Sequence, residues 1–458
     1  MDRRINVILK PLRRFAMLKP NASVLLFAAT ILAMILANSP LADRYHMLLA
    51  FPVELQAGQF SFFSHHGETM SMLSFVNDAL MAVFFFVIGL EIKQEVLIGE
   101  LSSIRKALLP IIAACGGMIV PVMFYMLVCN TPPEVNGAAI PMATDIAFAL
   151  AVLGLLGKRV PLSMRIFLTA LAVVDDIGGI IIIALFYSGH IAFEPLLISL
   201  IFLAILYVGG KLRVHNRFFF YIGGFIVWLL FLESGIHPTI AGVLVAFTVP
   251  ARPIVNLEAF TSDMTGYLSM LDYNEVLQSR KAEVLTSKQI QVLNNIHSLA
   301  DRTISPLQTI ADKLHPLVNY VILPLFAFVN AGVTFGDIQP NTLVNVPLAV
   351  FAGLFIGKTL GIFSFSYLFA ITPLASMPTG MTKRTLFGVS MLGGIGFTVA
   401  LFIANLSFDV TTEVGADLLN QAKLGVFAGS FVSGLCGYMV LKWVLPKGEV
   451  SDIACEEA

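Results

Sequence analysis

The run of residues 166–186 is apolar except for two adjacent aspartates, Asp175 and Asp176. As a helix rising about 1.5 Å per residue, it is long enough to cross a hydrocarbon core of about 30 Å. A carboxylate inside that core costs about 3 kcal/mol even on the insertion scales with the lowest penalties. Two in succession favour a functional role over a polar pair that only holds helices together.

The composition places the whole chain in the membrane class. Hydrophobic residues make up 57% of its 458 residues and charged residues only 12%, whereas soluble domains carry about 25% charged residues. The formal net charge of −1 indicates no nucleic-acid partner. Cysteines and histidines do not cluster at metal-ligand spacing, so we expect no cofactor and no disulfide framework.

Apolar segments recur along the chain and predict an all-α polytopic membrane protein with twelve transmembrane helices. Lysine and arginine gather in alternate connections, so the positive-inside rule places both termini in the cytoplasm. Arg44 and Lys423 are the exceptions. The predicted spans are 22–40, 72–92, 107–129, 138–156, 165–187, 195–212, 217–232, 237–250, 318–333, 342–371, 385–407 and 420–444.

Two long connections interrupt this single domain of residues 1–458. The segment 53–62 fits an extracytoplasmic β-hairpin, or equally an irregular loop. The segment 252–316 is a cytoplasmic insertion, and a variable solvated insertion is favoured over a regulatory element. We expect two short amphipathic helices in it, one starting near a capping box at Asp272 and Glu275. The other carries the stripe Ile290, Leu293, Ile296 and Leu299.

Two spans carry helix-breaking features at corresponding positions. In one, Pro141 and Thr144 flank the buried acid Asp145, and in the other a glycine-rich stretch runs from Gly393 to Gly396. They are the middle members of spans 3–5 and spans 10–12, and these triplets begin on opposite sides of the membrane. This layout predicts inverted repeats with two crossed discontinuous helices. For the glycines alone, plain tight packing would serve equally well.

A lysine in the middle of the tenth span, Lys358, requires a partner. The aspartates Asp175 and Asp176 are candidates, and Asp145 and Lys358 could each offset one of the helix-end dipoles at the breaks. Adjacent helical residues diverge by about 100°. We therefore expect Asp175 and Asp176 to divide between a hydrated cavity and a cation such as Lys358, and helix geometry leaves the assignment open.

This chemistry favours a transporter over an enzyme. Carboxylate, hydroxyl and carbonyl oxygens suit small hard cations, and desolvation penalises the ionised carboxylate, so protons should compete with the cation. One site that holds either a cation or protons, and opens to each side in turn, gives antiport. A cation channel or non-transporting membrane scaffold is the alternative. An intramembrane aspartyl protease is disfavoured because neighbouring acids on one helix do not meet across a gap, although Asp145 could meet one of the pair.

At these residues the chain resembles the NhaA family of bacterial sodium/proton antiporters. The resemblance covers acids, lysine, helix breakers and their order, from the second span to the eleventh. Inverted repeats are a known property of that family, so the repeat layout belongs to the resemblance and is not independent of it. The resembling stretches are 75–85 with Asp78, 141–150, 172–178, 234–237 with His237, 322–328, 356–358 and 394–398.

The resemblance implies roles for individual residues. Asp175 and Asp176 would form the Na⁺ or Li⁺ site, with Asp176 as the principal sodium ligand and Thr144 as a possible ligand. Asp175 would pair with Lys358 and release it when a cation arrives, and Asp145 would balance the crossed helix ends. His237 has a functional association in the family, although a lone histidine at a span end is more often a packed polar residue.

The resemblance also implies electrogenic exchange of cytoplasmic sodium for external protons, with a role in sodium and pH homeostasis. The protein would be a homodimer in the lipid of the bacterial inner membrane. Alkaline pH would activate it through Glu91, Glu95 and His315. The sequence departs from the family at two positions that bear on the pH set-point. Gln94 stands between Glu91 and Glu95 where the family has a basic residue, and Asp312, within the long insertion, stands where a histidine is familiar.

Overall fold

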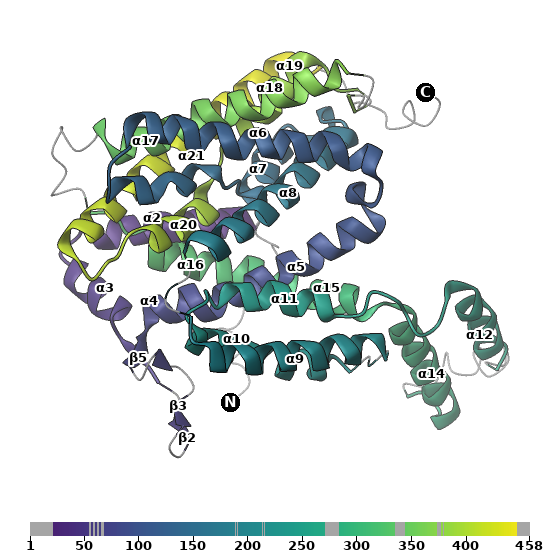
Figure 1. The fold of residues 1–458 in the computed structure, drawn as a ribbon. Coiled ribbons are helices and arrows are strands. Elements are labelled where there is room, and N and C mark those ends of the chain that lie inside the picture. Colours follow the sequence, from purple (N-terminus) through teal and green to yellow (C-terminus); the bar gives the residue numbers. More distant parts are fainter. Residues whose placement is uncertain are drawn as a thin grey trace, which may run out of the picture.

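A computed structural model describes residues 22–446, apart from 55, 58–59, 62–63, 66–67, 188, 190, 213, 215, 271–283, 335–343, 373–376 and 379. The described part is built of helices, with short strands confined to one connection (Figure 1). The predicted capping box at Asp272 and Glu275 lies outside the described residues.

Seven helices in these ranges are long and apolar enough to cross a membrane. They are Met72–Ile98 (α4, a π-helical turn and α5), α6 (Ile104–Val128), α8 (Leu162–Phe186), α9 (Phe193–Lys211), α10 (Arg217–Ser234), Val346–Ala370 (α17, a π-helical turn and α18) and α21 (Glu413–Val444). This architecture is that of an all-α polytopic membrane protein.

Three bent helix pairs raise the count in the described ranges to ten if each pair forms one span. The pair α2 (Ala22–Ala37) and α3 (Ala42–Leu49) bends by 118°, at Asn38, Ser39 and Pro40. The 3₁₀ helix η3 (Glu134–Met142) and α7 (Ile146–Gly154) bend by 43°, and α19 (Lys383–Leu392) and α20 (Phe397–Ser407) by 47°.

The expected spans at 237–250 and 318–333 correspond to helices outside that count. The first is α11 (Thr239–Thr248), which has only 10 residues. The second belongs to a continuous helical segment formed by α15 (Pro306–Leu317), the π-helical turn Val318–Ile322 and α16 (Leu323–Asn330). In the described ranges, the helices that are long and apolar enough to span a membrane are therefore fewer than the twelve predicted spans.

Glycines bring the backbones of α6 and α18 into direct contact. A Cβ added to Gly361 would meet the carbonyl oxygen of Gly116, and one added to Gly116 would meet that of Gly361. One turn earlier, a Cβ on Gly357 would lie 2.7 Å from the Cα of Pro121. Small residues spaced four apart allow such close helix packing in membranes. The contact holds Lys358, which follows Gly357, beside α6.

A second close contact joins α11 to α5. A Cβ on Gly242 would meet the carbonyl oxygen of Ala82. Farther along α5, Lys93 Nζ donates to the carbonyl oxygens of Phe247 at 2.7 Å and Val249 at 2.5 Å. A cation at the C-terminal end of a helix satisfies carbonyls that have no intrahelical partner. Lys93 thereby fixes the end of α11 against α5.

The largest buried cluster lies between α5, α8, α16, α17, α20 and α21. Phe402 of α20 belongs to it, with ring centroids 5.4 Å from Phe85 and 6.3 Å from Phe326. At the periphery, α9 and α10 expose apolar residues such as Ile201 (53%) and Ile222 (60%). An apolar interior together with an apolar outer surface is expected for helices in lipid.

Short strands occupy the connection between α3 and α4. Strand β1 (Pro52–Val53) and β4 (Ser64–His65) pair with β5 (Glu68–Ser71), and β2 (Gln56–Ala57) pairs with β3 (Phe60–Ser61), all antiparallel. Within the expected 53–62 hairpin, the paired residues are therefore β2 and β3. Val53 instead pairs with Met70 of β5, and the burial of Met70 fixes this register.

The insertion contains α12 (Leu257–Ser269) and α14 (Ser287–Thr303), and α15 begins within it. Helix α14 carries the predicted stripe 290–299, and it starts with a capping box of Thr286 and Gln289. Helices α12 and α14 pack on each other and lie beyond the ends of α9 and α11, apart from the bundle (Figure 1). An exposed ion pair of Arg217 and Asp301, at 3.2 Å, connects α14 to α10.

Candidate ion-binding site

Lys358 is fully buried and surrounded by three oxygen acceptors. Its ammonium forms an ion pair with Asp175 Oδ2 and donates to the carbonyl oxygen of Met142. It also donates to Thr144 Oγ1 at 2.6 Å. A buried charge is tolerable only when it is paired and hydrogen-bonded. The second oxygen of Asp175, Oδ1, is buried without a hydrogen-bond partner among the described residues.

The two interrupted helices meet at their breaks. Asp145 N donates to the carbonyl oxygen of Ile395 at 2.6 Å, and Thr144 Oγ1 donates to that of Gly393 at 2.8 Å. Residues 143–145 separate η3 from α7, and residues 393–396 separate α19 from α20. Polar groups that lose their helical hydrogen bonds at one break therefore bond to groups at the other break. Within a membrane this is necessary, because no water is available to replace those hydrogen bonds.

The carboxylate of Asp145 caps two helices at once. It accepts from Phe148 N at 3.1 Å in the first turn of α7. It also accepts from Thr398 N at 3.1 Å and Thr398 Oγ1 at 2.5 Å in the first turn of α20. Helix N-termini carry partial positive charge, so a carboxylate is stabilised at both.

Asp176 faces a small pocket, whereas its neighbour Asp175 faces Lys358. The pocket has a volume of about 70 Å³, and Thr144, Asp145, Thr398 and Glu91 also line it. We call it the inner pocket. In the described part of the chain, no hydrogen bond or ion pair holds the Asp176 carboxylate. This acid is therefore positioned to receive a cation or a proton.

The structure joins only two of the three predicted pH-sensing residues. Glu91 Oε1 lies 3.4 Å from His315 Nε2, and both side chains line the inner pocket while remaining more than one-third exposed. Glu95 does not line it. Its Oε1 accepts from Glu100 N at 2.7 Å, at the start of the 3₁₀ turn after α5. A helix turn separates Glu95 from Glu91, and that local bond directs its carboxylate to the loop.

A second pocket lies toward the C-terminal end of α8. Its volume is about 600 Å³, and Ile182, Met142, Tyr187 and Ser407 are among its lining residues. We call it the outer pocket. Tyr187 Oη donates to the Asn136 carbonyl oxygen at 2.9 Å and lies 3.0 Å from Ser407 Oγ, so hydrogen bonds fix its ring at the pocket wall. Met142 links this pocket to the surroundings of Lys358.

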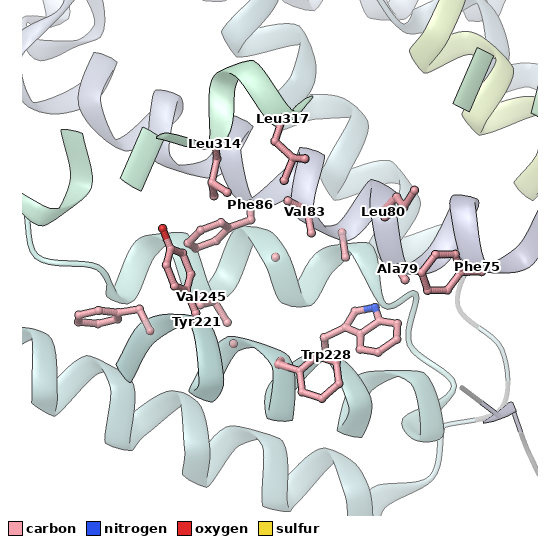
Figure 2. Close-up of a pocket in the computed structure, with 15 residues that line it drawn as sticks. Phe75, Ala79, Leu80, Val83, Phe86, Tyr221, Trp228, Val245, Leu314 and Leu317 are labelled. Atoms are coloured by element: carbon pink, nitrogen blue, oxygen red, sulfur yellow. The ribbon is translucent and has the colours of Figure 1, made fainter. Parts of the chain in front are cut away.

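A third, apolar pocket of about 400 Å³ lies between α5, α10 and α11. Figure 2 shows Phe86, Tyr221 and Trp228 among the side chains that line it. None of its fifteen lining residues carries a carboxylate or a basic group. Since it offers a cation no charged oxygen, we do not assign the ion site to it.

Asp78 and His237 form a separate polar pair. Asp78 Oδ1 lies 3.7 Å from His237 Nε2, and His237 Nδ1 lies 2.7 Å from Thr239 Oγ1. Trp228 Nε1 donates to the Asp78 carbonyl oxygen at 3.0 Å. These contacts hold His237 in a defined orientation at the start of α11, outside the linings of the inner and outer pockets.

Three groups around the site are not among the site residues that the sequence predicts. The backbone carbonyl of Met142 leaves no signal in a sequence, because every residue has a carbonyl group. Thr398 belongs to a resembling stretch to which no role is assigned, and Asn319, which lines the inner pocket, carries no sequence prediction. Its spacing of four residues from His315 is a signal that could have found it.

Known proteins match this chain over nearly its full length. The family model described as Na⁺/H⁺ antiporter 1 matches residues 13–441. The chain is 89% identical over 453 residues to the Na(+)/H(+) antiporter NhaA of Parabacteroides distasonis, covering 99% of this chain and 100% of that protein. Proteins of the same name from Porphyromonas gingivalis and Bacteroides thetaiotaomicron are 51% and 52% identical, over 95% and 96% of this chain and 96% and 98% of theirs.

Proposed function

Because the chain belongs to the Na⁺/H⁺ antiporter 1 family, we propose that it is a secondary active transporter that exchanges cytoplasmic sodium for external protons. One observation carries the assignment of the site. The Asp176 carboxylate faces the inner pocket without a partner in the described chain, next to the buried pair of Asp175 and Lys358.

The exchange operates by competition at the aspartate pair. A sodium ion that enters the inner pocket takes Asp176 as its principal ligand and displaces the proton held there. Asp175 turns from Lys358 to the cation, and Lys358, having lost its ion-pair partner, releases a second proton. Thr144, which contacts Lys358, becomes available as a further ligand. After the site opens to the other side, protons return and sodium leaves. Lithium, as a smaller hard cation, uses the same oxygen atoms.

Alternating access is supported by two separate pockets along α8. The inner pocket ends at Asp176, whereas the outer pocket begins at Ile182 and Met142. Lys358 contacts the linings of both, through Met142 of the outer pocket and Thr144 of the inner pocket. A modest change in the bend of the broken segments would transfer the site from one pocket to the other. We further propose more than one proton per sodium, so that transport is electrogenic.

The same proposal includes the full membrane topology. Twelve spans would form inverted repeats in which η3–α7 crosses α19–α20, with both termini in the cytoplasm of a bacterial inner membrane. The bends of 43° and 47°, together with hydrogen bonds between the two breaks, support this arrangement. Asp145 then compensates two helix N-termini, and Lys358 compensates the end of η3.

We also propose how the protein is regulated and assembled, as the family resemblance implies. Glu91 and His315 at the inner pocket, with Glu95 nearby on α5, would make exchange respond to alkaline pH. The strand segment between α3 and α4 would join two copies into a homodimer within the lipid. Its antiparallel strands, short and at the edge of the bundle, support a pairing role.

Replacement of Asp176 tests the site. In everted vesicles, Asp176→Asn should abolish sodium-driven and lithium-driven proton movement, because the neutral amide neither attracts the cation nor exchanges a proton. Asp263→Asn, which removes an exposed acid of α12, is the matched control and should exchange normally. Unchanged exchange in Asp176→Asn would refute the proposed site, and conductive sodium flux without proton countertransport would indicate a channel instead.

A further inference from the structure

Asn319 is an uncharged polar residue inside the inner pocket. It lies in the π-helical turn Val318–Ile322, and it lines the pocket together with Asp176, Glu91 and His315. It follows His315 by four residues, a spacing that places two side chains on one face of a helical segment. His315 lies near the end of α15, and Asn319 lies one helical turn after it.

The backbone around Asn319 is distorted in the same way as at two intramembrane charges. The π-helical turn Phe75–Leu80 contains Asp78, and the turn Gly353–Gly357 ends directly before Lys358. Such turns are rare and frequently occur at functional sites. The third π-helical turn in the described ranges is the one that holds Asn319. Its distortion therefore coincides with a polar side chain that faces the pocket.

Neighbouring neutral oxygens in the inner pocket already have partners. Thr144 Oγ1 accepts from Lys358, and Thr398 Oγ1 donates to Asp145. For the Asn319 amide, the described part of the chain offers no hydrogen bond. A hard cation exchanges its water for several oxygen ligands, and carboxylate and carbonyl oxygens both suit it. Among the described residues, the amide oxygen of Asn319 is a neutral side-chain ligand of this kind that has no partner.

We propose that Asn319 supplies a further oxygen ligand to sodium in the inner pocket, which Glu91 and Asp176 also line, and so sets cation affinity and the preference between sodium and lithium. The inference rests on the proposed exchange function. An amide oxygen reduces the cost of removing water from the cation. Unlike another carboxylate, it does so without adding a group on which protons would compete.

The test compares Asn319→Ala and Asn319→Ser in proteoliposomes, with KM and turnover measured for sodium and lithium separately. Asn319→Ala should raise the sodium KM about three- to tenfold, the range for loss of one polar contact, with turnover nearly unchanged. The lithium KM should change by a different factor, because the smaller ion uses the ligand set differently. Asn319→Ser, which retains an oxygen, should recover part of the affinity.

Val321→Ala is the matched control, because Val321 lies in the same π-helical turn and its side chain is 50% exposed. It should leave both KM values unchanged. An Asn319→Ala protein with wild-type KM values overturns the inference, as does an equal KM change in Val321→Ala, which would indicate packing of the turn. A wild-type protein without sodium-coupled proton flux contradicts the proposed function itself, and the inference falls with it.

Discussion

Asp145 and Lys358 are buried in the same region but meet opposite ends of helices. Asp145 accepts hydrogen bonds in the first turns of α7 and α20, whereas Lys358 donates to the carbonyl of Met142 at the end of η3. A helix carries about half a positive charge at its N-terminus and half a negative charge at its C-terminus. Each buried charge thus matches the helix end that it contacts, which makes both tolerable in an apolar environment.

The Thr398 hydroxyl should contribute measurably to stability. Thr398→Val keeps the shape of the side chain but removes one donor from the buried Asp145 carboxylate. An unsatisfied buried acceptor costs about 1–3 kcal/mol, and more when it is charged. We expect a lower midpoint in thermal unfolding of the detergent-purified protein.

Thr398→Ser is the control for that substitution, because it retains the hydroxyl and should melt close to the wild type. Equal melting of Thr398→Val and wild type would show that the two backbone N–H donors, from Phe148 and Thr398, suffice for Asp145.

Among the elements, the contact of α6 and α18 determines where Lys358 lies. The glycines Gly116 and Gly361 face each other, and neither leaves room for a side chain at the crossing. Lys358 is one turn before Gly361 on α18, so its reach to Asp175 of α8 depends on how closely α18 approaches α6.

Gly361→Val should therefore separate α6 from α18. Overpacking in a well-packed core costs about 1–3 kcal/mol, and backbone contacts leave little room to relax. We expect a lower yield of monodisperse protein and a lower melting midpoint by fluorescence-detected size-exclusion chromatography. A wild-type profile for Gly361→Val would show that the helices separate without loss of packing.

Gly179→Ala on α8 is the matched control for glycine replacement within a span. A Cβ at Gly179 would meet nothing within 4 Å. Alanine also favours a helix over glycine by about 0.5–1 kcal/mol. This variant should therefore be at least as stable as the wild type, so that any loss in Gly361→Val reports the crossing rather than a general need for glycine.

Elements of the fold differ in how well local sequence predicts them. The expected span 165–187 coincides with α8 (Leu162–Phe186) to within a few residues, because a long run that is apolar except for Asp175 and Asp176 fixes both ends. The expected span 22–40 becomes α2, which ends at Ala37, followed by α3 at 118°. Pro40 in the turn between them cannot continue a helix, and the direction of the next helix depends on packing. Tyr45 of α3, which donates to the Phe328 carbonyl oxygen at 2.7 Å, supplies that packing.

At the scale of the whole molecule, the inner pocket meets α8 at Asp176 and the outer pocket meets it farther along, at Ile182 and Phe186. A single site that serves both sides should show competition between its two ligands. Protonation removes the charge with which Asp176 attracts sodium. Lowering the pH therefore weakens sodium binding, whereas saturating sodium restores the same maximal rate.

Sodium-dependent proton flux across a pH series measures this competition. The sodium KM should rise as pH falls, by up to about tenfold per pH unit for each competing proton, while the maximal rate stays nearly constant. A maximal rate that falls with pH at constant KM would contradict competition and would indicate control by Glu91 and His315 alone.

Local sequence was sufficient to establish the membrane class, the family resemblance and the divergence of Asp175 and Asp176. These depend on apolar run length, on motif residues and on helix geometry, each of which acts within a few residues. The folded arrangement was needed to show that Asp175 is the acid that faces Lys358, that Glu91 meets His315, and that Asp145 caps two helices. Those outcomes depend on contacts between segments far apart in the chain, such as Lys358 with Asp175, 183 positions away, and local patterns do not encode them.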